Sequence, residues 1–184
     1  MDQEVTMTQT RRTALAVLIA SAVTCAGGPA LVANALPGDE GSVPAAELQY
    51  LIEEEKLAGD VYELALGEYG DQIFNHIAVS EDTHVDSVRT LLLRHEVTDP
   101  TIGNVAGEFT DLSLQGLYDQ LAQRVQTSRS EAMAVGILIE ETDITDLGEL
   151  LEMAPPAEVE QVVENLLAGS LSHLAAFERE VRQA

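Results

Sequence analysis

The sequence has no tryptophan, only three phenylalanines and four tyrosines, and a single cysteine. A core with so few aromatic side chains must be built from Leu, Val, Ile and Ala, a set that favours helices packed on helices. Apolar residues still make up 46% of the chain, which is enough to fill a core. A length of 184 residues fits one domain together with a targeting segment.

Positive charge is also scarce. Nine basic residues stand against 32 acidic ones, the formal net charge is −23, and Lys56 is the only lysine. A surface this negative repels phosphate backbones and anionic lipid, so we expect no nucleic-acid partner and no membrane-surface binding by the mature domain. Metal cations are the partners that it attracts. Much of the charge is equally explained by a solvated surface that keeps the protein soluble.

The first 36 residues have the form of a signal peptide. Arg11 and Arg12 precede an apolar run over residues 14–26, and small residues follow up to residues 33–35. Gly and Pro at residues 27–29 interrupt the run, which argues against a membrane span. We therefore expect an exported protein, by either the general or the twin-arginine route. Because Cys25 lies in this segment, the mature chain would have neither a disulfide nor a thiolate metal site.

Residues 37–44 have the composition of a linker, and residues 45–184 are expected to form one helical domain. Helical spacing of apolar residues predicts four long helices and one short one, with no competing strand pattern. Gly70 and the prolines at 155–156 end helices, while Ser113 and Ser128 or Ser130 are candidate N-caps. The predicted helices cover about 48–70, 72–95, 113–125, 130–154 and 157–182.

The predicted fold class is all-α, an antiparallel four-helix bundle of the ferritin-like kind. The first two and the last two long helices are joined by short turns, so each pair should form a hairpin. The connection between the hairpins is long and contains the short helix. One long crossover distinguishes the ferritin-like bundle from up-down-up-down bundles.

Carboxylates and histidines lie on the apolar stripes of these helices, where a carboxylate is costly unless something neutralises it. Glu81 and His84 are three residues apart, so both face one way. Glu55, Glu140 and His173 lie on the stripes of the other long helices. Taken alone, Glu55 is better explained as one of three consecutive glutamates on a solvated face, and it becomes a candidate ligand only together with the other residues. Glu141 replaces Glu140 if the helical phase is off by one, and Asp143 lies one turn beyond.

These residues approach the ligand set of the two-metal site in ferritin-like bundles, in which carboxylates bridge two ions and histidines bind terminally. Imidazole ligands suit iron, manganese or zinc better than calcium or magnesium. We therefore predict two transition-metal ions, with iron first and manganese or zinc as alternatives. The candidate ligands are Glu55, Glu81, His84, Glu140, Glu141, Asp143 and His173.

Several stretches resemble known proteins. Residues 55–62 resemble the Glu-x-x-Ala-x-x-x-Tyr of the first helix of bacterioferritins and rubrerythrins, and residues 77–84 resemble their second helix. Residues 53–58, 139–144 and 164–173 are similar to a poorly characterised ferritin-like domain family of exported bacterial and archaeal proteins. The resemblance covers about residues 46–180. It implies a ferritin-like fold and a pair of irons that react with oxygen or peroxide.

One departure from the superfamily pattern stands out, because Ser170 occupies the place of a glutamate three residues before His173. The site is one carboxylate short unless Asp143 or Glu141 supplies it.

Three functions stay open: an oxidoreductase, a cation-binding or sensing module without turnover, and a bundle whose inward polar residues are structural. The oligomeric state is also open, with a homodimer as one candidate. Without metal, Glu81→Ala is expected to be nearly neutral or stabilising, because inward carboxylates repel one another.

Overall fold

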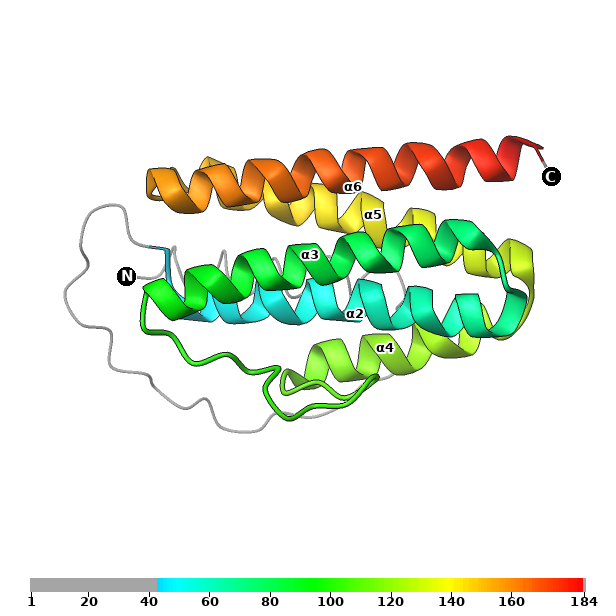
Figure 1. Cartoon of the computed structure of the whole chain (residues 1–184), viewed down its shortest axis with the longest axis horizontal. Coiled ribbons are helices and arrows are strands. Elements are labelled where there is room, and N and C mark those ends of the chain that lie inside the picture. Colours follow the sequence, from blue (N-terminus) through cyan, green and yellow to red (C-terminus); the bar gives the residue numbers. More distant parts are fainter. Residues whose placement is uncertain (1–42, 184) are drawn as a thin grey trace, which may run out of the picture.

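The computed structural model describes residues 43–183, and within them the chain forms five α-helices and no strand (Figure 1). The expected all-helical class is therefore confirmed. The signal peptide and most of the linker fall outside the described residues. None of the five helices has the length and apolarity that crossing a membrane requires. The helices are α2 (Ala45–Tyr69), α3 (Gln72–Arg94), α4 (Leu112–Val125), α5 (Arg129–Glu152) and α6 (Ala157–Gln183).

The helix ends follow from a few residues. Gly70 ends α2 with φ 70°, a left-handed conformation that glycine adopts at little cost, and its N–H donates to the Leu66 carbonyl at 2.8 Å. Ser128 caps α5 as expected, because its hydroxyl accepts from the Glu131 N–H. The expected cap at Ser113 is wrong. Asp111 caps α4, since its carboxylate accepts from the N–H groups of the first turn.

The long helices pack as two antiparallel pairs. α2 packs along α3 and α5 along α6, while fewer contacts join α3 to α6 and α2 to α5. The C-terminal ends of α3 and α5 contribute apolar residues to the same cluster, so these two helices run in the same direction (Figure 1). Such a parallel arrangement needs a long connection, and residues 95–128, including α4, provide it.

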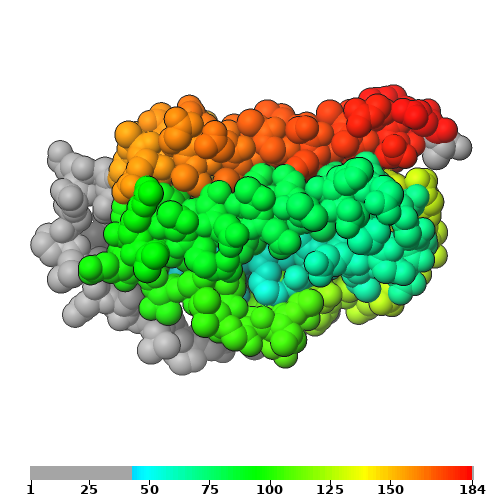
Figure 2. Space-filling view, viewed as in Figure 1, coloured from blue at the N-terminus to red at the C-terminus, as the bar shows by residue number. Residues whose placement is uncertain are grey.

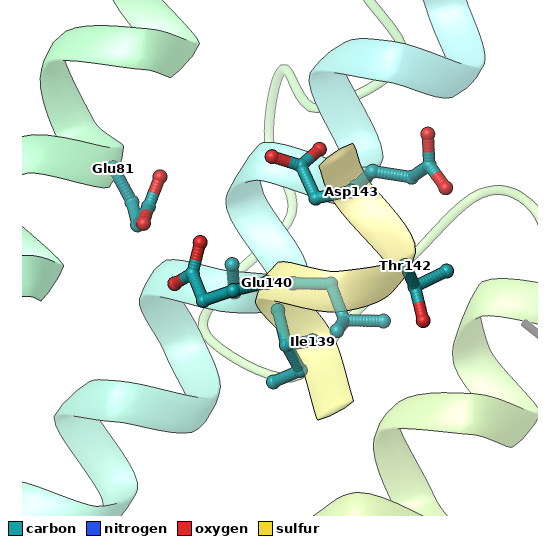
Figure 3. A pocket seen from close by; sticks show the side chains of 8 residues that line it. Glu81, Ile139, Glu140, Thr142 and Asp143 are labelled. Atoms are coloured by element: carbon teal, nitrogen blue, oxygen red, sulfur yellow. The ribbon is translucent and has the colours of Figure 1, made fainter. Parts of the chain in front are cut away.

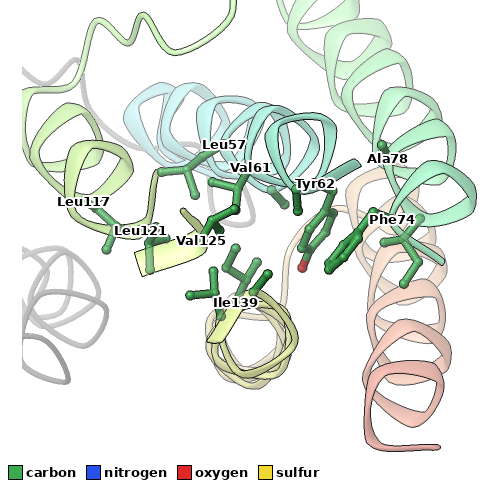
Figure 4. Close-up of a cluster of buried hydrophobic side chains, with 14 of the residues drawn as sticks. Leu57, Val61, Tyr62, Phe74, Ala78, Leu117, Leu121, Val125 and Ile139 are labelled. Atoms are coloured by element: carbon green, nitrogen blue, oxygen red, sulfur yellow. The ribbon is translucent and has the colours of Figure 1, made fainter. Parts of the chain in front are cut away.

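Two apolar clusters fill the interior, one toward each end of the long helices. The first, drawn in Figure 4, contains the packed rings of Tyr62, Phe74 and Phe177 together with the inner face of α4. The second is built from Leu, Ile and Val near the start of α2 and α6. Between the two clusters each long helix carries a buried ionisable group. These groups are Glu55 on α2, Glu81 and His84 on α3, Glu140 on α5 and His173 on α6.

The segment before α4 is held against α2 by carboxylates. Glu53, which the sequence places off the interior stripe, is 3% exposed and accepts hydrogen bonds from the N–H groups of Thr110 and Asp111. Asp60 accepts from the Gly107 N–H at 2.8 Å. Burial of Glu53 therefore serves the packing of this segment, and Glu55 is left to face the interior.

Candidate metal centre

Glu81 lies at the centre of the polar layer and contacts a histidine with each of its two oxygens. Oε2 is 2.7 Å from Nδ1 of His84, one turn further along α3. Oε1 is 2.9 Å from Nδ1 of His173, which projects from α6. The two imidazole rings are stacked with their centroids 5.5 Å apart. One carboxylate is thus shared by two histidines from different helices.

Two further carboxylates complete two groups of three possible ligands, each with its ligand atoms within 4.8 Å of one another. Glu55 Oε2 is 3.1 Å from His84 Nδ1, and Glu140 Oε2 is 3.6 Å from His173 Nδ1. We refer to Glu55 and His84 as the Glu55 half, and to Glu140 and His173 as the Glu140 half. Glu81 belongs to both, and all five residues are buried.

The Glu140 half is supported by additional hydrogen bonds. The Tyr62 hydroxyl donates to Glu140 Oε1 at 2.6 Å, and Nε2 of His173 is 3.0 Å from the Ser80 hydroxyl. Tyr62 is fully buried, and its ring packs on Phe177. Tyr62 therefore packs in the apolar cluster and also contacts the polar cluster directly. Outer hydrogen bonds of this kind fix the orientation of metal ligands.

The Glu55 half lacks such supports. Oε1 of Glu55 is buried and has no hydrogen-bond partner among the described residues. The His84 ring lies against the backbone of α6 at Gly169, where a Cβ atom would come within 2.5 Å of Nε2. Only glycine leaves room for the imidazole at this position. An unpaired buried carboxylate oxygen is costly, so this half of the cluster is polar and incomplete as it stands.

The candidate that could supply the missing carboxylate is Asp143. It lies one turn after Glu140, and its carboxylate accepts a hydrogen bond from the buried Ser170 hydroxyl. Asp143 lines a small cavity of about 20 Å³ together with Glu81 and Glu140, whose carboxylates face one another in Figure 3. Asp143 belongs to neither group of three. Glu141 is exposed, so of the two neighbouring glutamates only Glu140 reaches the cluster.

Burial and mutual contact shift the pKa values of the cluster. Burial alone would lower the pKa of each histidine, but the carboxylates at each Nδ1 outweigh it and raise the pKa of His84 to about 10 and of His173 to about 9. Burial raises the pKa of Glu55 to about 7. For Glu81, burial would raise the pKa, but the close contacts with both histidines outweigh it and lower the pKa. Burial, followed by the neighbouring carboxylates of Glu55 and Glu140, raises the pKa of Asp143.

The residues present fit a metal ion. Each half offers two carboxylates and one imidazole nitrogen within mutual reach, and within residues 43–183 neither Oε1 of Glu55 nor Nδ1 of His173 has a hydrogen-bond partner of good geometry. Mixed oxygen and imidazole ligands suit iron, manganese and zinc. The expected placement of Glu55, Glu81, His84, Glu140 and His173 on one interior layer agrees with the structure. Their roles as ligands stay a prediction.

The sequence did not predict two residues that contact the histidines of the cluster, Ser80 and Gly169. Ser80 gave no signal, because a lone serine on a helix is usually solvated. Gly169 did give one, since a glycine inside a helix costs about 1 kcal/mol relative to alanine and needs a packing reason. That reason is the His84 ring.

Comparison with known proteins places this domain in a family. Residues 45–184 match the model of "Uncharacterized protein domain (DUF2202)". The chain is 39% identical over 127 residues to the protein MJ0754 of Methanocaldococcus jannaschii, covering 69% of each chain. It is also similar to the crystal structure of the hypothetical protein MJ0754, with a TM-score of 0.76, 35% identity and coverage of 82% of this chain and 86% of that one. The chain belongs to the DUF2202 family.

Proposed function

We propose that this protein binds two transition-metal ions, with iron first and manganese or zinc as alternatives, in a buried centre between its long helices. The observation that carries the proposal is the shared carboxylate of Glu81. It lies between two histidines, and each histidine has a second carboxylate beside it. A bridging carboxylate with a terminal imidazole on each side is the ligand pattern of a dinuclear centre.

Charge balance supports two ions rather than one. Glu55, Glu81, Glu140 and Asp143 carry four negative charges when ionised, and two divalent cations carry four positive ones. Buried charges are tolerated when they are paired or coordinate a metal. In the metal-free chain protons on the histidines take part of this role, because their pKa values are raised. Metal and protons therefore compete for the same carboxylates.

We further propose that the fold is a ferritin-like four-helix bundle formed by α2, α3, α5 and α6. The parallel direction of α3 and α5, the two antiparallel pairs and the long connection with α4 support it. The resemblance of residues 55–62 and 77–84 to bacterioferritin and rubrerythrin helices points the same way. Export through the segment 1–36 belongs to this proposal, since it would put the centre in contact with metal outside the cytoplasm.

A second candidate function is the oxidation of ferrous iron by oxygen or peroxide. The supporting observation is the cavity beside Glu81, Glu140 and Asp143, whose volume of about 20 Å³ admits one small molecule (Figure 3). Iron bound there would supply electrons to such a molecule. Leu57, Ala58 and Ile139 line the cavity and would limit water, and Tyr62 would hold Glu140 in place.

Metal analysis of the purified chain tests the binding function. After anaerobic loading with Fe²⁺, Mn²⁺ or Zn²⁺ and removal of free metal, the wild type should retain two ions per chain. Glu140→Gln should lose an ion, while Glu141→Gln, the exposed neighbour, should retain both. A wild type that retains no metal refutes the proposal. Oxygen consumption by the Fe²⁺-loaded chain tests the second function, which is abandoned if iron oxidises no faster than in buffer.

A further inference from the structure

A groove lies over the outer side of the cluster, between α2, α3 and the segment that leads to α4. Its volume is about 380 Å³. In Figure 2 a strip of α2 stays visible between α3 and that segment. Gly59 and Ala78 are among the residues that line the groove, so small side chains leave it open where α2 and α3 meet. Glu81 lies directly behind, since a Cβ atom at Gly59 would be 3.4 Å from the Glu81 Cβ.

The groove is acidic, but only part of its charge is neutralised. Lys56 pairs with Asp60 at 2.5 Å, and Arg89 pairs with Asp86 at 2.6 Å. The remaining outer carboxylates, Glu63 and Asp82, are exposed, and neither has an ion pair or hydrogen bond with any other residue of the part that the structure describes. They come from different helices and line the same groove. Two unpaired carboxylates on its walls favour a cation.

A buried carboxylate connects the groove to the cluster. Of the five cluster residues, only Glu55 also lines the groove. Its side chain is 1% exposed, Oε2 contacts His84, and Oε1 has no hydrogen-bond partner among the described residues. Rotation of this one side chain would move a carboxylate oxygen between the groove and the Glu55 half.

We propose that this groove is the entrance for divalent cations. Glu63 and Asp82 capture the hydrated ion, and Glu55 transfers it to the cluster. The proposal rests on the metal-binding function proposed above. The small cavity on the α5 side also has carboxylates in its lining, but its volume of about 20 Å³ has room for about one water, whereas the groove of about 380 Å³ admits a hydrated cation. The entrance therefore opens into the Glu55 half, for which the described residues show no hydrogen bond from outside the cluster.

The first test removes the capture charges. Binding of Co²⁺ is followed by its visible absorbance in stopped flow, with the wild type, Glu63→Gln/Asp82→Asn, and Glu68→Gln/Glu164→Gln. The control pair removes the same two charges from exposed positions outside the groove. At low salt the groove variant should bind about three- to tenfold more slowly than the control. The difference should shrink near 1 M salt, where the Debye length is only about 3 Å.

The second test blocks the groove after the protein has folded. Cys25 is the only cysteine, so Asp82→Cys in a Cys25→Ser background gives one reactive thiol. Coupling a bulky maleimide to it should slow Co²⁺ uptake at least about tenfold, far beyond the effect of Asp82→Cys alone. The same label on Glu164→Cys, an exposed position on α6, should leave uptake unchanged. The final number of ions bound should be the same in every labelled protein.

The outcomes separate the two proposals. If the wild type binds no metal, the metal-binding function fails and the entrance fails with it. If the wild type binds two ions and both groove modifications leave the uptake rate at the control value, the metal function stands and the entrance is refuted. Slower uptake with unchanged final stoichiometry supports the entrance.

Discussion

The two halves of the cluster are built from the same residue types but are held differently. In the Glu140 half, Tyr62 donates to the carboxylate and Ser80 contacts the far nitrogen of the histidine. In the Glu55 half, one carboxylate oxygen is unpaired and the histidine rests against the bare backbone of Gly169. The Glu140 half is oriented by hydrogen bonds from outside the cluster, whereas in the Glu55 half the two ligands, within the described residues, bond only to each other and contact Glu81.

This difference indicates that the two halves bind their ions with different affinities and exchange rates. A half whose ligands are already oriented loses little conformational entropy on binding, so we expect the Glu140 half to hold its ion more tightly. The Glu55 half adjoins the acidic groove and has a carboxylate oxygen free to turn, so we expect it to exchange its ion faster. The following predictions test whether the halves are unequal and whether Glu81 joins them.

The largest effect is expected for Glu81→Gln, which removes the charge shared by both halves. The number of ions bound should fall from two to at most one, and the affinity of any remaining ion should fall at least about 100-fold. Isothermal titration with Zn²⁺ measures both quantities. Glu141→Gln, one exposed charge removed from α5, is the control and should behave as wild type. A variant that binds two ions with wild-type affinity would contradict the shared role.

The structure also changes the expected effect of Glu81 on the metal-free fold. From repulsion between inward carboxylates, the sequence predicted a nearly neutral or stabilising substitution, and a destabilising one only if Glu81 satisfied a buried hydrogen-bond network. Glu81 contacts two buried histidines whose pKa values are raised, so Glu81→Gln removes the negative charge that both of them face. Urea unfolding in chelator at pH 7 should show Glu81→Gln destabilised by ~1–3 kcal/mol.

The helices and the inward residues could be predicted because both follow from periodicity. Glu55, Glu81, His84, Glu140 and His173 occupy apolar stripes, and a stripe fixes the direction of a side chain once the helix is known. The partners could not be predicted, because they depend on contacts between helices. Ser80 meets His173 from another helix, and Asp143 reaches Ser170 only because α5 and α6 pack side by side.

The next largest effect concerns the Glu55 half and two glycines. In Gly169→Ala the new Cβ would meet His84 Nε2 at 2.5 Å, so the ring must move and this half should bind its ion about 10- to 100-fold more weakly. Gly136→Ala meets the Phe177 ring at 2.7 Å instead. It should destabilise the fold by ~1–3 kcal/mol through overpacking and leave the affinity for the ion of the Glu55 half unchanged. Zn²⁺ titrations and thermal melts of both variants measure metal affinity and stability. Equal Zn²⁺ affinities in the Glu55 half of the two variants would contradict this prediction.

A smaller effect is expected in the Glu140 half for Ser80→Ala. The substitution removes the hydrogen bond that orients His173, so the tighter of the two ions should bind about tenfold more weakly. The other ion should be unaffected. Ser87→Ala on the same helix is the matched control, because its hydroxyl donates only to the Thr83 carbonyl within α3. Equal Zn²⁺ affinities in the two serine variants would mean that Ser80 does not position the ligand.

A last effect, which needs no metal, is the pH dependence of the metal-free fold. The folded pKa values of His84, about 10, and His173, about 9, lie above their ordinary value of 6.5. Stability from these groups is complete below about pH 6.5 and is lost as the pH rises through 9 to 10. The melting temperature in chelator should fall by on the order of 10 °C between pH 7 and pH 10. The double variant His84→Gln/His173→Gln should show a flatter profile, and an unchanged slope would contradict the assignment.

The positions of the ions test the shared centre most directly. Crystals of the chain loaded with Mn²⁺ or Zn²⁺ should give two anomalous-scattering peaks, one on each side of Glu81. One peak should be in contact with Glu55 and His84 and the other with Glu140 and His173. At limiting metal the peak beside Glu140 should fill first. A single peak, or peaks that Glu81 does not contact, would contradict a dinuclear centre built around this carboxylate.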